Sequence, residues 1–469
     1  MGVGISPSAP KRFQSMTETE ILDTKEKRMA PGASRMYRSP VDILQRLIRF
    51  DTTNPPGNEA ECMGWIDDLL TESGIDTRIL FEKPDRPNLI ARLRGRGAAP
   101  PLLLYGHVDV VTTANQKWTH PPFAGALADG YIWGRGALDM KGGVAMMLAA
   151  FMRAEAEGLT PAGDIVLAVL SDEEAGGELG ADFLVAKHAS EFEGIRYAIG
   201  EFGGFALRVS GRKFYPIQIA EKQICWMKAT IRGPGGHGSQ PMRDGAMAKL
   251  GRMLRQLDQN RLPVRITPVA RRMIETMCSA LPFPSGRLIR LLLNPRFTDM
   301  ALQLMGARGR IFDAMLHNTV NATIVRGGEK VNVIPSEIVV EMDGRLVPGC
   351  SPEDMMAELR GIMGDQVEFE VIRHEPVPGE PDMGLFDTLA DILREADPGA
   401  VPVPLLLSGA TDARFFSRLG IRSYGFLPMN LPADFNFTRT IHAEDERIPV
   451  ESLHFGTEAI YRLLQRYNG

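Results

Sequence analysis

The chain has few cysteines for its length, and they are widely spaced. Its 469 residues include only Cys62, Cys225, Cys278 and Cys350, with no CxxC pair among them. This spacing indicates neither a disulfide framework nor a zinc site built on thiolates. We therefore expect a protein that works in a reducing compartment, the cytoplasm.

Long apolar runs are also lacking. No uninterrupted apolar run reaches membrane-spanning length, and the first residues lack the apolar core of a secretory signal. Residues 1–38 are polar, which predicts a flexible N-terminal extension. An amphipathic targeting segment is the alternative there, although interspersed acidic residues disfavour it. The net charge of -5 and the scattered basic residues predict neither a nucleic-acid partner nor a membrane partner.

Two common hydrolase signatures are missing. The chain contains no HExxH motif, which disfavours the common helical zinc peptidase site. It contains no GxSxG motif either, and Ser239 in "GGHGSQP" lacks the strand-turn-helix context of a nucleophilic serine. A serine hydrolase is therefore disfavoured as well.

What the chain does contain is an alternation of strand-like and helix-like segments. Apolar runs such as "LLLYGHVD" and "DIVLAVLS" alternate with helical patterns over residues 39–214 and again over 377–469. This alternation predicts an α/β domain with a mainly parallel sheet and α helices on both faces, because continuous apolar runs suit strands that are covered on both sides. Residues 215–376 follow another order of strands and helices, which predicts an inserted α+β domain of the ferredoxin-like type.

Potential metal ligands stand at the ends of the predicted strands, where open α/β sheets collect functional groups. These are His107 and Asp109 after one strand, Glu173 and Glu174 after another, and Glu201 after a third. Asp139 lies in the glycine-rich stretch "WGRGALDMKGG", and His442 follows the returning α/β segment. Two imidazoles and several carboxylates suit one or two divalent ions, with zinc, manganese and cobalt as candidates.

Four motifs resemble those of the M20 metallopeptidases: "GHVDVV", "WGRGALDMKGG", "SDEEAGG" and "GPGGHGSQP", followed by the late His442. The resemblance covers residues 40–469. This family includes aminoacylases, desuccinylases, acetylornithine deacetylases and glutamate carboxypeptidases. The resemblance implies a metal-binding catalytic domain and an inserted lid domain through which two chains form a homodimer.

The resemblance also implies a dinuclear centre, with zinc favoured over manganese and cobalt. Asp139 would bridge the two divalent metal ions. One ion would also bind His107 and Glu201, and the other would bind Glu174 and His442. These five residues would complete the metal centre.

Three further residues receive catalytic roles from the resemblance. Asp109 would orient the imidazole of a metal ligand two residues before it. Glu173 would be the general base that takes a proton from metal-activated water and passes it to the leaving amine. His237, in the lid, would stabilise the oxyanion in the partner subunit's site. The implied reaction is hydrolysis of an amide bond beside a free carboxylate, in a dipeptide, at a peptide C-terminus or in an N-acyl amino acid.

Substrate-binding residues follow from the same resemblance. Arg345 in "MDGRLVPG" would bind the substrate carboxylate through a bidentate pair, with a surface charge on a strand as the alternative. Asn321, Gly409 and Thr411 match positions that the family uses for substrate. His120 is interpreted as a packing or turn residue, and Lys141 as electrostatic support for its loop.

About seventy residues separate the first predicted lid strand from "TVNATIV", more than a simple crossover needs. This length resembles the carboxypeptidase S and N-acyl-amino-acid hydrolase members. The apolar residues of the segment would either add to the lid core or line an acyl-chain pocket. Two other functions stay open: an N-carbamoyl amidohydrolase of the same fold, and a non-catalytic homologue that binds amino-acid derivatives.

Overall fold

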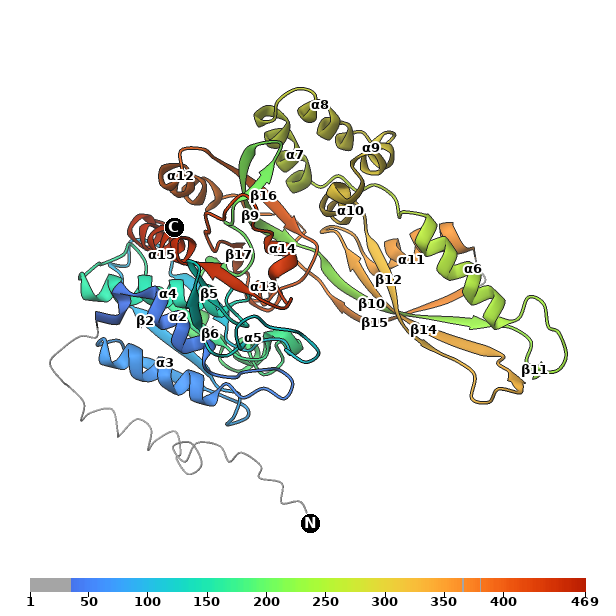
Figure 1. Cartoon of the computed structure of the whole chain (residues 1–469), viewed down its shortest axis with the longest axis horizontal. Coiled ribbons are helices and arrows are strands. Elements are labelled where there is room, and N and C mark those ends of the chain that lie inside the picture. Colours follow the sequence, from blue (N-terminus) through green and yellow to red (C-terminus); the bar gives the residue numbers. More distant parts are fainter. Residues whose placement is uncertain (1–34, 365–366, 380) are drawn as a thin grey trace, which may run out of the picture. The chain divides into compact units, whose positions relative to one another are not determined.

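The computed structural model describes residues 35–364, 367–379 and 381–469, which form two compact units (Figure 1). Unit 1 comprises the described residues up to Ile217 together with Met383–Pro402 and Phe415–Gly469. Unit 2 comprises Gln218–Asp382 and Val403–Arg414. The predicted N-terminal extension lies outside the described residues except for its last four, which form the 3-10 helix η2 (Arg35–Arg38). No helix of the described chain has both the length and the apolar composition needed to span a bilayer.

Unit 1 is an α/β structure. Its strands are β1 (Thr77–Leu80), β2 (Asn88–Leu93), β3 (Leu102–His107), β4 (Ala126–Ala128), β5 (Tyr131–Trp133), β6 (Ile165–Leu170), β7 (Tyr197–Gly200), β8 (Leu207–Val209), β17 (Arg422–Gly425) and β18 (Arg447–Pro449). Its helices are η2, α2 (Pro40–Ile48), α3 (Ala60–Glu72), α4 (Lys141–Ala156), η3 (Glu173–Ala175), α5 (Ala181–Lys187), η4 (Ala189–Phe192), α12 (Phe386–Ala396), α14 (Phe437–Thr440) and α15 (Val450–Arg466). Three elements continue from one unit into the other: β9 (Arg212–Glu221), β16 (Ala400–Leu407) and α13 (Ala413–Ser417).

The large sheet has the order β1-β2-β6-β3-β7-β17-β9-β16, with β8 beside β9. Strands β6, β3, β7 and β17 run parallel to one another, whereas β2 runs antiparallel to both of its neighbours, β1 and β6. Every residue of β3 and β6 is buried, as the continuous apolar runs predict. The prediction of a mainly parallel α/β sheet is therefore confirmed.

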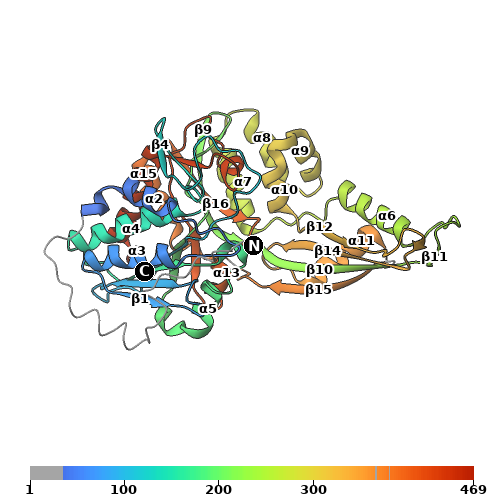
Figure 2. The same cartoon turned by 60° about the horizontal axis from the view of Figure 1, so that its bottom comes forward.

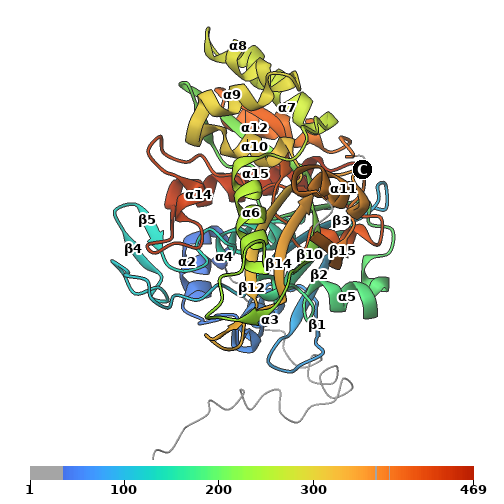
Figure 3. The same cartoon turned by 90° about the vertical axis from the view of Figure 1, so that its right-hand side faces the viewer.

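Helices cover both faces of this sheet. The crossover from β3 to β6 carries α4 and moves one way along the sheet, whereas the crossover from β6 to β7 carries α5 and moves back. Right-handed crossovers in opposite directions place their helices on opposite faces, and α4 and α5 can be followed in Figures 2 and 3. The contacts of two adjacent residues of β3, which point to opposite faces of the sheet, support this arrangement. The Tyr105 ring lies 4.8 Å from the ring of Phe416 in α13, whereas Gly106 faces Met140 and Val144 at the start of α4.

Unit 2 holds an antiparallel sheet with the order β12-β14-β10-β15. Its elements are β10 (Gln223–Arg232), β11 (Gly236–His237), α6 (Ala246–Gln259), α7 (Pro268–Ala280), α8 (Ser285–Arg290), η5 (Leu291–Leu293), α9 (Thr298–Met305), η6 (Gly306–Gly309), α10 (Arg310–Leu316), β12 (Thr319–Arg326), β13 (Val333–Ile334), β14 (Glu337–Leu346), α11 (Pro352–Met363) and β15 (Val367–Glu375). Helices α6 and α11 pack against each other and against this sheet (Figure 1). This strand order and these two helices form a split βαβ arrangement, as the sequence predicts.

The long segment between β10 and β12 adds helices α7 to α10 to the first crossover of unit 2. These helices and the turn η5 pack mainly on one another, and buried side chains such as Met273, Ile274 and Leu302 form their interior. Phe283 and Leu304 stay largely exposed. Most of the apolar content of this segment therefore builds additional core in unit 2.

Candidate active site

The metal-ligand candidates converge at one edge of the unit 1 sheet. Strands β6, β3 and β7 are parallel neighbours, so their carboxyl ends meet at the same edge. His107 ends β3, the pair Glu173 and Glu174 stands in η3 just after β6, and Glu201 follows β7. These side chains come together because each of the three buried strands ends at or just before the polar residues that follow it in the sequence.

Asp139 links two imidazoles through different carboxylate oxygens. Its Oδ1 lies 3.2 Å from Nε2 of His107, and its Oδ2 lies 2.9 Å from Nε2 of His442. Glu201 Oε2 approaches the same His107 nitrogen at 3.5 Å, and Glu174 Oε1 lies 3.2 Å from the His442 nitrogen. The five side chains therefore form two clusters that share one carboxylate.

Distances alone group the ligand candidates differently. Two sets of three side chains offer ligand atoms that all lie within 4.8 Å of one another: His107 with Asp139 and Glu174, and His107 with Glu173 and Glu201. Oε2 of Glu173 lies 4.0 Å from Nε2 of His107. Geometry therefore admits Glu173 as a ligand as well as a base, and only the contacts of His442 favour Glu174 for the second cluster.

The site favours positive charge between its carboxylates. Hydrogen bonds to Asp139 and Glu174 raise the pKa of His442 to about 10. Burial alone would lower the pKa of His107, but its hydrogen bonds to Asp109, Asp139 and Glu201 outweigh burial and raise it well above its usual value. Burial also raises the pKa of Glu174, although its contact with His442 works in the opposite direction. These donors fit divalent cations, which supply such charge without a proton.

Asp109 does more than the sequence predicts. The Nδ1 atom of His107 lies 3.0 Å from the backbone oxygen of Asp109 and 3.4 Å from its Oδ1. The same carboxylate accepts the backbone N–H of Glu173 at 3.1 Å and of Glu174 at 3.0 Å. Burial opposes its ionisation, yet hydrogen bonds from His107 and Asn54 keep the pKa of Asp109 below its usual value. Asp109 thus holds both the imidazole and the acidic loop.

A first buried ion cluster supports that acidic loop, and sequence reasoning missed it. Arg86 donates two hydrogen bonds to Glu59, at 2.6 and 3.0 Å, and one to Oδ1 of Asp172 at 2.8 Å. Asn54 joins Asp172 to Asp109 with hydrogen bonds of 3.1 and 2.8 Å. Asp172 has φ of 72°, a left-handed conformation that a non-glycine residue rarely adopts without such support.

A second buried cluster supports the other side of the site. Arg135 donates to Oε2 of Glu446 at 2.6 Å and to the backbone oxygen of His442 at 3.2 Å. The other oxygen of Glu446 accepts the backbone N–H of Leu138 at 2.8 Å and of Asp139 at 3.2 Å. This ion pair holds two metal-ligand candidates, Asp139 and His442, by their backbones. The only feature of the sequence that could have indicated it is that Arg135 and Glu446 lie close to the motifs of these candidates.

The remaining predicted site residues belong to unit 2, and two of them already have partners there. Arg345 donates to both oxygens of Asp343, at 2.8 and 3.1 Å, on the same face of β14. The backbone N–H and hydroxyl of Thr411 donate to Oε2 of Glu221 at 3.0 and 2.9 Å. Asn321 is exposed on β12 opposite Asp343, and Gly409 is half-buried in the loop after β16.

His237 is exposed in β11, where its Nδ1 lies 2.8 Å from the hydroxyl oxygen of Ser239. His120 and Lys141, which were not predicted to bind metal or substrate, make packing and backbone contacts. The His120 ring packs 5.0 Å from the ring of Trp133. Lys141 is buried and donates to the backbone oxygen of Phe50 at 2.8 Å, which ties the start of α4 to the end of α2.

The sequence analysis missed Lys222, a buried lysine close to the predicted substrate residue Arg345. Its ammonium group donates to the backbone oxygens of Ala314 and His317 and to the hydroxyl of Thr319, at 2.8 to 3.1 Å. Burial, reinforced by the nearby charge of Arg345, lowers the pKa of Lys222 to about 7.

This depressed pKa predicts a pH-dependent stability. Between pH 7 and about 10.5 the unfolded state binds more protons at Lys222 than the folded state. The free energy of unfolding should therefore rise with pH in this window, by up to about 1.4 kcal/mol per pH unit. In Lys222→Met, denaturant titrations at several pH values should give a smaller slope than the wild type. Lys228→Met, which removes a surface lysine paired with Glu370, should keep the wild-type slope, and equal slopes in all three proteins would contradict the prediction.

The comparisons with known proteins identify the family of the chain. The model of the family described as Peptidase family M20/M25/M40 matches residues 103–466. The chain belongs to this family. As an M20 protein it is an enzyme of the metallopeptidase and amidohydrolase type.

Three curated relatives of this M20 chain illustrate the range of named activities. It is 30% identical over 385 residues to a probable carboxypeptidase S-like protein of Dictyostelium discoideum, which covers 78% of this chain and 71% of that one. It is 28% identical over 377 residues to the human N-fatty-acyl-amino acid synthase/hydrolase, with coverage of 78% and 74%. It is 30% identical over 451 residues to the succinyl-diaminopimelate desuccinylase of Methylorubrum extorquens, with coverage of 92% and 99%.

Solved structures share the M20 fold. The metallo-carboxypeptidase of Sulfolobus solfataricus superposes with a TM-score of 0.66 at 16% identity, over 92% of this chain and 99% of that one. A peptidase of Bacillus subtilis that is described as binding a dinuclear metal gives a TM-score of 0.55 at 15% identity, over 92% and 97%. The architecture of the M20 chain is therefore that of metallopeptidases.

Proposed function

We propose that the chain is a dinuclear metal-dependent hydrolase that cleaves an amide bond next to a free carboxylate, in a dipeptide, at a peptide C-terminus or in an N-acyl amino acid. The observation that carries this proposal is the position of Asp139, whose two oxygens face His107 at 3.2 Å and His442 at 2.9 Å. One acidic side chain, Glu201 or Glu174, accompanies each imidazole. Such a pair of clusters suits two divalent ions, of which zinc is our first candidate and manganese or cobalt the alternatives.

In this proposal five side chains bind the metal ions and Glu173 transfers protons. Asp139, His107, Glu201, Glu174 and His442 would hold the ions. When bound, such ions polarise a carbonyl group and lower the pKa of water. Glu173 would take the proton of the attacking water and deliver it to the leaving amine. Its backbone N–H is fixed by Asp109 at 3.1 Å, which keeps the base on the loop beside the ligands.

The free carboxylate of the substrate would be bound by unit 2. Arg345 keeps three of its five N–H groups when two of them bond Asp343. We propose that these remaining groups bind the carboxylate, and that Asn321, Gly409 and Thr411 contribute to substrate binding. The four cysteines are free, which supports our proposal of a cytoplasmic location.

The test is to strip the purified full-length protein with a chelator and reload it with zinc, manganese or cobalt. We expect two ions per chain, loss of hydrolysis on stripping and recovery on reloading. The substrates should be dipeptides and N-acyl amino acids, each compared with its C-terminal amide. The amides should be poorer by at least about 100-fold, because they leave the carboxylate site unpaired. One ion per chain would contradict the dinuclear centre, and equal rates on the amides would contradict carboxylate recognition.

We further propose a homodimer in which His237 completes the partner subunit's site as an oxyanion donor. His237 is exposed and its Nδ1 faces Ser239, which leaves the other ring nitrogen for such a role. Inactive His237→Ala and inactive Glu173→Ala chains should regain part of the wild-type rate when they are mixed and allowed to exchange subunits. Mixing either variant with itself is the control. Exchange without recovered activity would argue against a shared site.

A further inference from the structure

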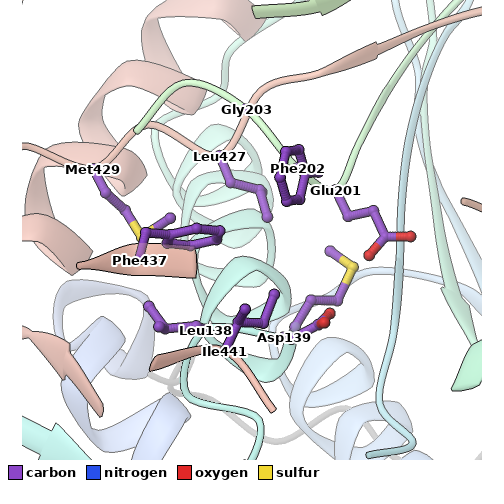
Figure 4. Close-up of a pocket in the computed structure, with 10 residues that line it drawn as sticks. Leu138, Asp139, Glu201, Phe202, Gly203, Leu427, Met429, Phe437 and Ile441 are labelled. Carbon is purple, nitrogen blue, oxygen red and sulfur yellow. The ribbon is translucent and has the colours of Figure 1, made fainter. Parts of the chain in front are cut away.

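Helices α7 to α10 of unit 2 (residues 268–316, the α7–α10 segment) leave large apolar side chains exposed. These helices and their turns pack on one another and are seen together in Figures 1 and 3. Even beside the metal-ligand candidates of unit 1, apolar neighbours such as Leu427, Met429 and Phe437 are buried (Figure 4). In the α7–α10 segment, by contrast, five large apolar residues are 43 to 79% exposed: Phe283, Phe297, Met300, Leu304 and Ile311. Exposed apolar side chains that gather in one region mark an interaction surface.

Three of these residues form a stripe along α9, the α9 stripe. Phe297, at the N-cap, Met300 and Leu304 are three and four residues apart, so they lie on the same side of the helix. Ala301 and Leu302 are buried on its other side, against the rest of the segment. The inner side of α9 therefore belongs to the core of unit 2, and the outer apolar side is left to solvent or to a partner.

The same helices are rich in arginine. Residues 268–316 contain seven arginines, no lysine and three acidic residues, which gives a net charge of +4 in a chain whose net charge is -5. All seven arginines are exposed: Arg271, Arg272, Arg287, Arg290, Arg296, Arg308 and Arg310. The positive charge is therefore local, and the acidic balance of the rest of the chain hides it.

The acidic residues of the segment leave most of this charge unpaired. Asp299 and Asp313 face Arg261, which lies before α7, with oxygens 3.9 and 2.9 Å from its Nε. Glu275 lies 4.0 Å from Arg271. For five other arginines the described chain places no carboxylate within 4.0 Å: Arg287, Arg290, Arg296, Arg308 and Arg310. An unpaired guanidinium on the surface is available to an anionic partner.

Cations and apolar groups are neighbours on this surface. The guanidinium carbon of Arg287 lies 5.5 Å from the centroid of the Phe283 ring. Arg296 directly precedes Phe297, at the start of the α9 stripe. Apolar side chains among arginines match a bilayer surface, in which anionic headgroups overlie hydrocarbon.

Other partners fit this combination less well. Nucleic acid would pair with the arginines but would leave Met300 and Leu304 beside charged phosphates instead of burying them. A second copy of the chain would bring the same arginines against these ones, and like charges across an interface oppose association. An anionic bilayer satisfies both kinds of side chain at once.

We propose that the α7–α10 segment docks on the surface of an anionic lipid bilayer. The α9 stripe and Phe283 enter the apolar edge of the interface, and the unpaired arginines contact the phosphate groups of the lipids. This interaction goes beyond the proposed hydrolysis and does not depend on it, because vesicle binding is measured without substrate. It also replaces the expectation of no membrane partner, which rests on the charge of the whole chain.

Co-sedimentation of the full-length protein with vesicles is the first test. The vesicles contain either phosphatidylcholine alone or phosphatidylcholine with about one-third phosphatidylglycerol. The partition coefficient should be at least about tenfold higher for the anionic vesicles. It should fall at least about tenfold when the salt rises from about 0.05 to about 0.5 M, because salt screens surface charge. No binding, or equal binding to both kinds of vesicle, would overturn the proposal.

Substitutions in the α9 stripe test its apolar part. Met300→Gln with Leu304→Gln keeps good helix formers in α9 and removes apolar area. This double variant should lower the partition coefficient on anionic vesicles by at least about tenfold. Leu127→Gln with Val331→Gln is the control, since both residues are exposed and lie outside the α7–α10 segment. The control should stay within about twofold of the wild type, and an equal loss in both double variants would contradict a site on α9.

Two triple variants with the same change in net charge test the arginines. The first removes three unpaired arginines: Arg287→Gln, Arg296→Gln and Arg308→Gln. The second removes three exposed arginines of unit 2 that pair with carboxylates: Arg232→Gln, Arg252→Gln and Arg326→Gln. The first should lower binding to anionic vesicles by at least about tenfold, and the second by less than about threefold. Equal losses would show a general attraction by charge and would overturn the site.

Circular dichroism and analytical ultracentrifugation without vesicles complete the experiment. All variants should keep the wild-type spectrum and the wild-type oligomeric state, and if the stripe variant is unfolded, the two arginine variants still decide the question. If the stripe variant dissociates an oligomer and the wild type does not bind anionic vesicles, the α9 stripe joins two copies and the proposal is overturned. If the wild type does not bind the vesicles but binds polyglutamate, the partner is an acidic protein and the proposal is likewise overturned.

Discussion

Replacing Glu173 with glutamine is expected to lower kcat by about 10²- to 10⁴-fold while the protein still binds two metal ions per chain. Glutamine keeps the size of the side chain but cannot accept the proton of water. Oε2 of Glu173 lies 4.0 Å from Nε2 of His107, farther than any of the four contacts that link the imidazoles to Asp139, Glu201 and Glu174. Metal content by elemental analysis and steady-state kinetics measure the two halves of this expectation.

Glu178 provides the matched control, because it is an exposed glutamate five residues further along the same loop. Glu178→Gln should keep both kcat and metal content. If Glu173→Gln lost one metal ion, Glu173 would be a ligand in the group that contains His107 and Glu201. If Glu173→Gln kept wild-type activity, another group would have to be the base.

Replacing Arg86 with methionine is expected to lower the free energy of unfolding by about 3–5 kcal/mol, because it leaves buried carboxylates without their cation. Arg86 bonds Glu59 with two nitrogens and Asp172 with one, and all three side chains are buried. Burial and the charge of Asp109 raise the pKa of Glu59 to about 7 even in the presence of Arg86. Denaturant titration of the metal-loaded protein measures the loss.

Arg94→Met is the control for this change. Arg94 pairs with Asp164 at 3.3 Å, but 84% of its side chain is exposed. Such surface pairs contribute about 0–1 kcal/mol, so this variant should stay near the wild type. Because Asp172 precedes the proposed base Glu173 and the proposed ligand Glu174, Arg86→Met should also bind metal more weakly. Equal stability of the two variants would show that the buried cluster is not what holds this loop.

The clustering of the metal-ligand candidates could be predicted from the sequence because most of them follow buried strands. "IVLAVL" is apolar throughout, and the acidic residues follow it closely. The sequence therefore predicts both the end of β6 and the position of Glu173 and Glu174. The same holds for His107 at the end of β3. Where a hydrophobic run and a polar cluster adjoin, secondary structure and site are specified by one local pattern.

Other parts could not be predicted because nothing local marks them. Arg86 lies in a loop, and its partner Asp172 is 86 residues away, so only the folded chain pairs them. Strands β9 and β16 contain Pro216, Pro402 and Pro404, residues that argue against a strand. The pairing of Arg345 with Asp343 did have a signal, since residues two apart on a strand share a face.

The contacts of Arg135 with Glu446 and with the backbone of His442 also affect when the metal-ligand candidates can come together. Arg135 and His442 are 307 residues apart, and all of unit 2 is synthesised between them. A growing chain can form β3, α4, β6 and β7 and so present His107, Glu174 and Glu201 early, because domains fold as they emerge from the N-terminal end. Until the segment that carries His442 and Glu446 leaves the ribosome, however, these carboxylates have neither His442 nor the carboxylate of Glu446 to order Asp139. Completion of the metal centre is therefore a late step of biosynthesis, and a truncated chain would not form it.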